Sequence, residues 1–180
     1  HLQVCLGSQL SRSTVRAALV SYLQNAGITN LSTVYGFPPK LTKEGEFFDG
    51  QDPGHASGVV IYLWFEAQHE QRFALGGAHS GKKGVNYSLV MDCYLRSTHK
   101  KSQDAGDDND NFLDSLVSAI RADRNAGAPG LVFQWGEGQF PNEGVDIDIA
   151  SFYPRILNGA GTATQIYSSV RVNVTEIVTS

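Results

Sequence analysis

The clearest pattern in the chain is residues 85–96, which read VNYSLVMDCYLR. Apolar side chains occupy every odd position of this stretch, and polar side chains occupy most of the even ones. Successive side chains of a strand point to opposite faces of a sheet, so the pattern predicts an antiparallel strand with one buried face. A second run, residues 59–65 (VVIYLWF), is continuously apolar and predicts a strand buried on both faces that continues into the polar residues 66–72.

Other segments have helical or shorter strand patterns. Residues 13–26 place apolar side chains at spacings of three and four, with Ser11 or Ser13 as the cap and Gly27 as the stop. Residues 110–125 predict a second amphipathic helix, and the acidic residues 104–110 form a solvated lead-in that suits the positive end of its dipole. Further strands are expected at residues 32–37, 131–135, 145–149 and 165–178.

Together these elements predict a single α+β domain over residues 1–180, with an antiparallel β-sheet and two helices packed on one face. A chain of 180 residues is long enough to bury a core without staples. Residues 40–57 are rich in Gly, Pro and acidic side chains and predict a long loop or arm. The apolar pair Phe47 and Phe48 within it needs a surface to dock on, either this protein's own core or another subunit.

Composition narrows the class of protein. Hydrophobic residues make up 41% and charged residues 18%, and the 19 Gly exceed the expected number of about 13, which favours many tight turns. No apolar run approaches the ~20 residues that span a bilayer, so we expect no membrane association. The net charge of −4 argues against a dedicated duplex-DNA binder. Cys5 and Cys93 are too few for a disulfide scaffold, and no signal-peptide pattern is visible, so we expect a soluble, intracellular domain.

The segments that resemble catalytic or metal-binding motifs each lack residues that the motif requires. Residues 76–83 (GGAHSGKK) approach a phosphate-binding loop, but Lys83 stands where a hydroxyl side chain should hold magnesium, and a strand follows where a helix is needed. His69-Glu70 lacks the second His of a zinc-protease motif, because Phe73 occupies that position. The acidic residues 104–110 lack the Gly and Glu of a calcium loop. We therefore predict no catalytic, cofactor or metal site and no enzyme.

One enzymatic alternative stays open, in which a site is assembled from distant residues. Its candidates are His55, His69, His79, Asp146 and Asp148.

The glycine-rich residues 76–84 predict a hairpin tip. We expect this tip, through His79, Lys82 and Lys83, and the arm, through Phe47 and Phe48, to contact other subunits or partners.

The order of these elements resembles the tail terminator (tail completion) proteins of long-tailed, lambda-like bacteriophages. The resemblance covers nearly the whole chain and rests on order and pattern. It is carried by a helix with residues 14–20 (TVRAALV), strands at residues 33–37, 58–63 (GVVIYL) and 87–95 (YSLVMDCYL), a helix at 110–125 and a closing strand at 165–178. The long arm and an insertion at residues 140–163 distinguish this chain from shorter members.

The resemblance implies a structural virion protein. Family members form a ring, typically of six subunits, that caps the tail tube and stops its polymerisation. The ring joins the tail tube protein to the head-tail connector protein. The genomic DNA passes through the lumen without specific binding. The implied location is the head-proximal end of the virion tail, and the host cytoplasm during assembly. Another phage neck or tail-tube subunit stays open as an alternative.

Overall fold

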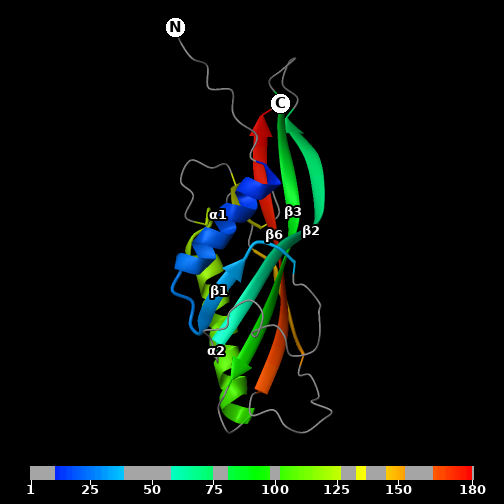
Figure 1. The fold of residues 1–180 in the computed structure, drawn as a ribbon. Coiled ribbons are helices and arrows are strands. Elements are labelled where there is room, and N and C mark those ends of the chain that lie inside the picture. The colour runs from blue at the N-terminus through cyan, green and yellow to red at the C-terminus, as the bar shows by residue number, and fades with distance from the viewer. Residues whose placement is uncertain are drawn as a thin grey trace.

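The computed structural model describes residues 11–38, 58–74, 81–97, 102–126, 133–136, 145–152 and 164–179 (Figure 1). Within them, two helices and six strands follow in this order: α1 (Arg12–Asn25), β1 (Leu31–Tyr35), β2 (Gly58–Ala74), β3 (Lys82–Ser97), α2 (Ser102–Ala122), β4 (Phe133–Trp135), β5 (Ile147–Phe152) and β6 (Thr164–Thr179). The predicted α+β class is confirmed. The predicted arm at residues 40–57 lies outside the described residues.

The six strands form one sheet in the order β1-β2-β3-β6, and both β4 and β5 pair with the outer side of β6. Every pairing is antiparallel except that of β1 with β2, which is parallel. The expectation of a purely antiparallel sheet was therefore wrong at this one edge. Parallel neighbours need a long connection, and residues 36–57 are long enough to provide one.

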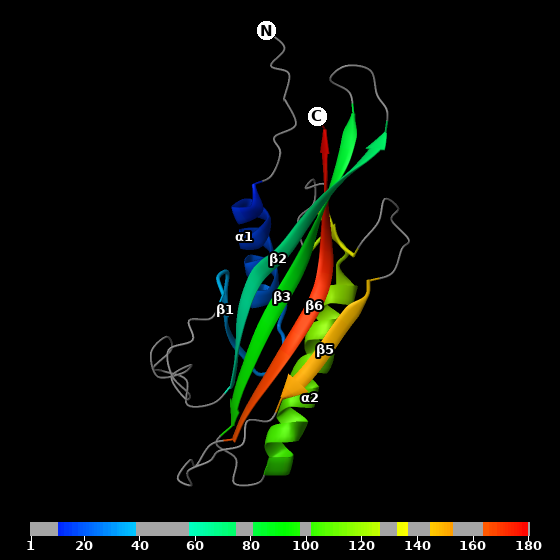
Figure 2. The same ribbon diagram turned by 90° about the vertical axis from the view of Figure 1, so that its right-hand side faces the viewer.

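Both helices lie on the same face of the sheet, as predicted (Figure 2). The core between them is one cluster of buried side chains. Helix α1 contributes Val15, Leu19 and Leu23, and all six odd-numbered residues from Val85 to Leu95 of β3 belong to the same cluster. From α2 and β6 come Ala105, Phe112, Leu113, Leu116, Ala119, Ile120, Ile166, Val170, Val172 and Val174.

The ends of the helices follow from local chemistry. The Ser11 side chain accepts a hydrogen bond from the Thr14 backbone N–H at 3.2 Å, which caps α1 at one of the two predicted residues. At the other end, Gly27 adopts a φ of 70°, a backbone conformation that glycine reaches without steric cost.

Helix α2 begins at Ser102, eight residues before the predicted start. The acidic residues 104–110 are therefore part of the helix and not a loop leading into it, which corrects the expectation. The apolar Ala105 and the polar Asn109 are both buried and extend the buried side of the helix by two turns. A single alanine among polar residues carries little periodic signal, so only the contact with the sheet decides where this helix starts.

Leu116 is fully buried at the middle of α2, and its truncation tests how much this packing stabilises the domain. We expect Leu116→Ala to lower the free energy of unfolding by about 2–5 kcal/mol, because it removes apolar contacts and leaves a cavity. Urea denaturation measures the change. Ser118→Ala is the control on the exposed side of the same helix and should shift stability by no more than about 0.5 kcal/mol. Equal effects of the two variants would contradict this account of the core.

Candidate interaction surfaces

The residues predicted to contact partners fall into two groups. Phe47, Phe48 and His79 lie outside the described residues. The sequence predicted that Lys82 and Lys83 lie in a hairpin tip. Instead, both residues belong to the start of strand β3. Lys82 pairs with Ala74 on one side and Thr179 on the other, so the ladder with β6 holds this end of β3 in strand conformation.

Of the residues of the enzymatic alternative, His55 and His79 lie outside the described residues, and the described ones are not brought together. His69 is exposed on β2, whereas Asp146 and Asp148 are exposed at β5, and strands β3 and β6 lie between β2 and β5. Within the described residues, no group of three or more His, Cys, Asp or Glu side chains is placed to hold a metal ion. The two described helices are not long and apolar enough to cross a membrane.

The sheet face opposite the helices carries a row of aromatic side chains, which we call the aromatic stripe. It crosses strands β1, β2, β3, β6 and β5 and begins just beyond β1. Its members are Phe37, Tyr35, Tyr62, Tyr94, Tyr167 and Phe152, and the ring centroids of successive members are 5.2, 5.3, 5.9, 5.0 and 5.6 Å apart. These separations are in the range of favourable aromatic pairs.

Exposure varies along the aromatic stripe. Tyr62 in the middle is only 2% exposed, whereas the two terminal rings, Phe37 and Phe152, are 44% and 55% exposed. Sequence reasoning assigned Tyr62 to the core. It is buried, but in a small separate cluster with Val60 on the face opposite the helices. The stripe therefore presents its apolar area to solvent mainly at its two ends, one at each lateral edge of the sheet.

A buried carboxylate ties the aromatic stripe to the sheet. Asp92 of β3 is 6% exposed, and its two oxygens accept hydrogen bonds from two neighbouring strands. The Trp64 indole N–H donates to Oδ2 at 2.8 Å, and the Tyr167 hydroxyl donates to Oδ1 at 2.5 Å. Alternation along residues 85–96 correctly placed Asp92 on the face away from the main core, but it could not show that aromatic side chains from β2 and β6 bury it.

The same surroundings favour neutral tyrosines. Burial, together with the hydrogen bond to Asp92 and its negative charge, raises the pKa of Tyr167 to about 12. Burial is also the main cause that raises the pKa of Tyr94 and of Tyr62 above its usual value of 10. These hydroxyls remain protonated donors throughout the neutral range.

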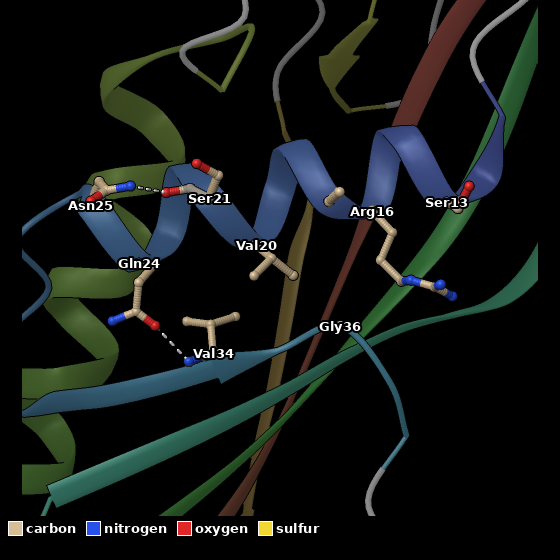
Figure 3. A pocket seen from close by; sticks show the side chains of 9 residues that line it. Ser13, Arg16, Val20, Ser21, Gln24, Asn25, Val34 and Gly36 are labelled. Carbon is tan, nitrogen blue, oxygen red and sulfur yellow. Dashed lines mark hydrogen bonds between the residues drawn. The ribbon is translucent and has the colours of Figure 1, made fainter.

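A groove of about 500 Å³ lies between α1 and β1 (Figure 3). It is lined by Ser13, Arg16, Ala17, Val20, Ser21, Gln24, Asn25, Val34 and Gly36. The Gln24 side chain forms hydrogen bonds with backbone groups of β1 that point away from β2. Its Oε1 accepts from the Val34 backbone N–H at 2.8 Å, and its Nε2 donates to the Ser32 carbonyl at 3.3 Å. The amide thus takes the place that a further strand would fill.

Beside Arg16, the backbone at Gly36 packs closely against α1. A Cβ added at Gly36 would lie 3.2 Å from Val20 Cγ2 and 3.5 Å from Arg16 Cγ, so the chain can pass this close to α1 only with a small residue. No residue of this groove was singled out from the sequence as part of an interaction surface. The only available signal was the helical spacing of the lining residues of α1.

Comparison with known protein families finds no family model that matches this chain, and no curated protein matches it either.

The Asp92 network predicts a stability effect on the open face. We expect Asp92→Ala to lower the free energy of unfolding by about 1.5–3 kcal/mol, because the Trp64 and Tyr167 donors lose a charged acceptor. Chemical denaturation measures the loss. Asp148→Ala, which removes an exposed carboxylate on β5, is the matched control and should be nearly neutral. A neutral Asp92→Ala variant would show that the buried carboxylate does not stabilise the sheet.

The raised pKa of Tyr167 also predicts alkaline destabilisation. The folded-state pKa of about 12 exceeds the unfolded value of 10, so folding favours the protonated form. This contribution is complete below pH 10 and is lost as the pH rises from 10 through 12. We expect the unfolding midpoint in urea to fall in this window, and Tyr167→Phe to show a shallower fall than the parent chain. An identical pH profile for both would contradict the assignment.

Proposed function

We propose that this protein is a structural subunit of a bacteriophage tail, and specifically a tail terminator. The observation that carries the proposal is the order of elements. Helix α1, the short strand β1, the long pair β2–β3, helix α2 and the closing strand β6 occur in the sequence order that the resemblance implies. Both helices cover one face of the sheet, and among the described residues no helix covers the other face and no strand pairs with the outer sides of β1 and β5.

The proposed role depends on a ring of copies, typically six. Subunits of a ring meet through two different surfaces, and the contact closes only if each copy is rotated by the right angle from the last. A closed ring on the last layer of tail tube protein covers the sites to which the next layer would add. Its opposite side is then free to bind the head-tail connector protein, at the head-proximal end of the virion tail.

Electrostatics are compatible with a lumen for DNA. The chain has a net charge of −4, so it lacks the excess of cations that neutralises the phosphate backbone in tight DNA complexes. Genomic DNA would pass such a ring without specific binding. The proposal assigns assembly to the host cytoplasm and no chemical reaction to this protein.

A tube-length assay tests the proposed function. We expect the purified full chain, added to polymerising tail tube protein, to bind tube ends and shorten the tubes as its concentration rises. Electron microscopy measures tube length and locates the added protein. Bovine serum albumin at the same concentration is the control for nonspecific crowding. Unchanged tube length at excess protein would overturn the terminator proposal, and self-assembly of the chain into long tubes would identify it as a tail-tube subunit instead.

A further inference from the structure

We propose that copies of this chain join edge to edge, with β5 of one copy seated against β1 and the α1/β1 groove of the next. The inference rests on the proposed function, because it names the contact between the copies of the proposed ring. It is drawn from four features of the described residues: the two sheet edges, their exposed apolar side chains, their level in the sheet and their charges.

The two edges each lack a partner strand on their outer side within the described residues. In the described part of the chain, β1 pairs only with β2 and β5 pairs only with β6, so each has an outer side without a strand. On β1, the exposed Gln24 side chain bonds the Val34 N–H and the Ser32 carbonyl. An incoming strand can displace this amide, since the same two groups would bond its backbone and Gln24 would turn into solvent.

Exposed apolar side chains concentrate at the same edges. Among the described residues, the large hydrophobic side chains classed as exposed are Phe37, Ile149 and Phe152. Phe37 follows β1 by two residues, and the other two belong to β5 at the opposite edge. They are 44%, 41% and 55% exposed, so joining the edges would remove apolar area from water on both sides of the contact.

The two edges also lie at the same level along the strands. Val34 of β1 is in register with Ile61, which pairs with Cys93. Cys93 pairs with Ser168, and Ser168 with Ser151 of β5. One row of residues therefore crosses five strands from β1 to β5. Copies placed side by side need no large shift along the strands to bring these edges together, and the direction of the strands makes the new pair antiparallel.

This register assigns a partner to each exposed ring and methyl group. Ile149 shares the helix-side face with Ser151 and lies two residues before it, which puts it level with Gly36 in the row that begins two residues after Val34. In the neighbouring copy, Ile149 would therefore meet the groove beside Ala17 and Val20. On the other face, Phe152 lies in the row of Thr33, through Tyr167, Tyr94 and Val60, so it would meet Thr33 of the neighbouring copy. Phe37, two residues beyond Tyr35, is level with Asp148 of the next copy.

Charge favours the joining of unlike edges over like ones. Strand β5 carries an exposed acid, Asp148, and the exposed Asp146 precedes the strand. Asp148 alternates with the helix-side residues Ile147 and Ile149, so it lies on the face that carries Phe152. Two β5 edges would place acids against acids, whereas β1 has no charged side chain. The contact is therefore head-to-tail, and it propagates into a ring or a filament instead of ending at a dimer.

Cross-linking tests the contact directly. We would prepare the full chain as Thr33→Cys/Phe152→Cys, the pair that the register places opposite each other, on a Cys5→Ser background in which Cys93 is buried and shielded. Oxidation, or a short bis-maleimide, should give a ladder of covalent multimers that ends at the size of the ring. The single variants Thr33→Cys and Phe152→Cys are the matched controls and should remain monomers on a denaturing gel. The absence of a ladder, or dimers formed equally by the single variants, would overturn the inference.

A charge placed in the contact provides an independent measurement by native mass over a concentration series. We expect Ile149→Asp to raise the concentration needed for association by about tenfold, because the register brings this side chain to the groove of the neighbouring copy. The melting temperature should be nearly unchanged, because Ile149 is already exposed. Ala122→Asp, at an exposed position of α2, is the control. Unchanged association of the Ile149→Asp variant would contradict the proposed pairing.

The outcomes separate this contact from the proposed function. A ladder from particles that are open tubes would support the edge contact and overturn the terminator proposal. Rings that shorten tail tubes but give no ladder would support the terminator proposal and overturn the edge contact.

Discussion

Strand β3 is hydrogen-bonded on both sides along nearly its whole length, and the other elements take their positions from it. Its pairing runs from Lys82 to Arg96 with β2 and from Lys82 to Ser97 with β6, and its alternation decides which face each neighbouring side chain occupies. A shift of one residue in either ladder would move the buried set from Val85 to Leu95 to the opposite face. Because this alternation places the apolar side chains on one face, the two helices have a single apolar surface to cover.

The two faces of the sheet are stabilised by different means. The helix face is a conventional apolar core, closed by Leu19, Phe112 and Leu116. The opposite face has no helix in the described residues and depends on stacked rings and on the Asp92 carboxylate between Trp64 and Tyr167. A buried charge is tolerated when charged hydrogen bonds replace the lost water, and Asp92 receives one from each neighbouring strand.

Because the two faces are stabilised differently, the exposed apolar side chains of the aromatic stripe lie at the lateral edges of the sheet. The aromatic stripe is buried in its middle at Tyr62 and exposed at Phe37 and Phe152. Gln24 satisfies the β1 edge with a side chain, which costs less to displace than a strand of the same sheet. A domain built in this way can remain monomeric in isolation and still be prepared for lateral assembly, which is what the proposed ring subunit requires.

The sequence by itself determined most of the secondary structure, because periodicity is a local property. The alternation of residues 85–96, the apolar run at 59–65 and the helical spacing of 13–26 each specify one element and its buried side. Interactions between distant segments decided the rest. The parallel pairing of β1, the early start of α2, the burial of Asp92 and the extension of β3 to Lys82 all depend on a partner strand or face contributed from elsewhere in the chain. The groove and the aromatic stripe likewise join residues from separate elements, and no spacing within one segment encodes such a meeting.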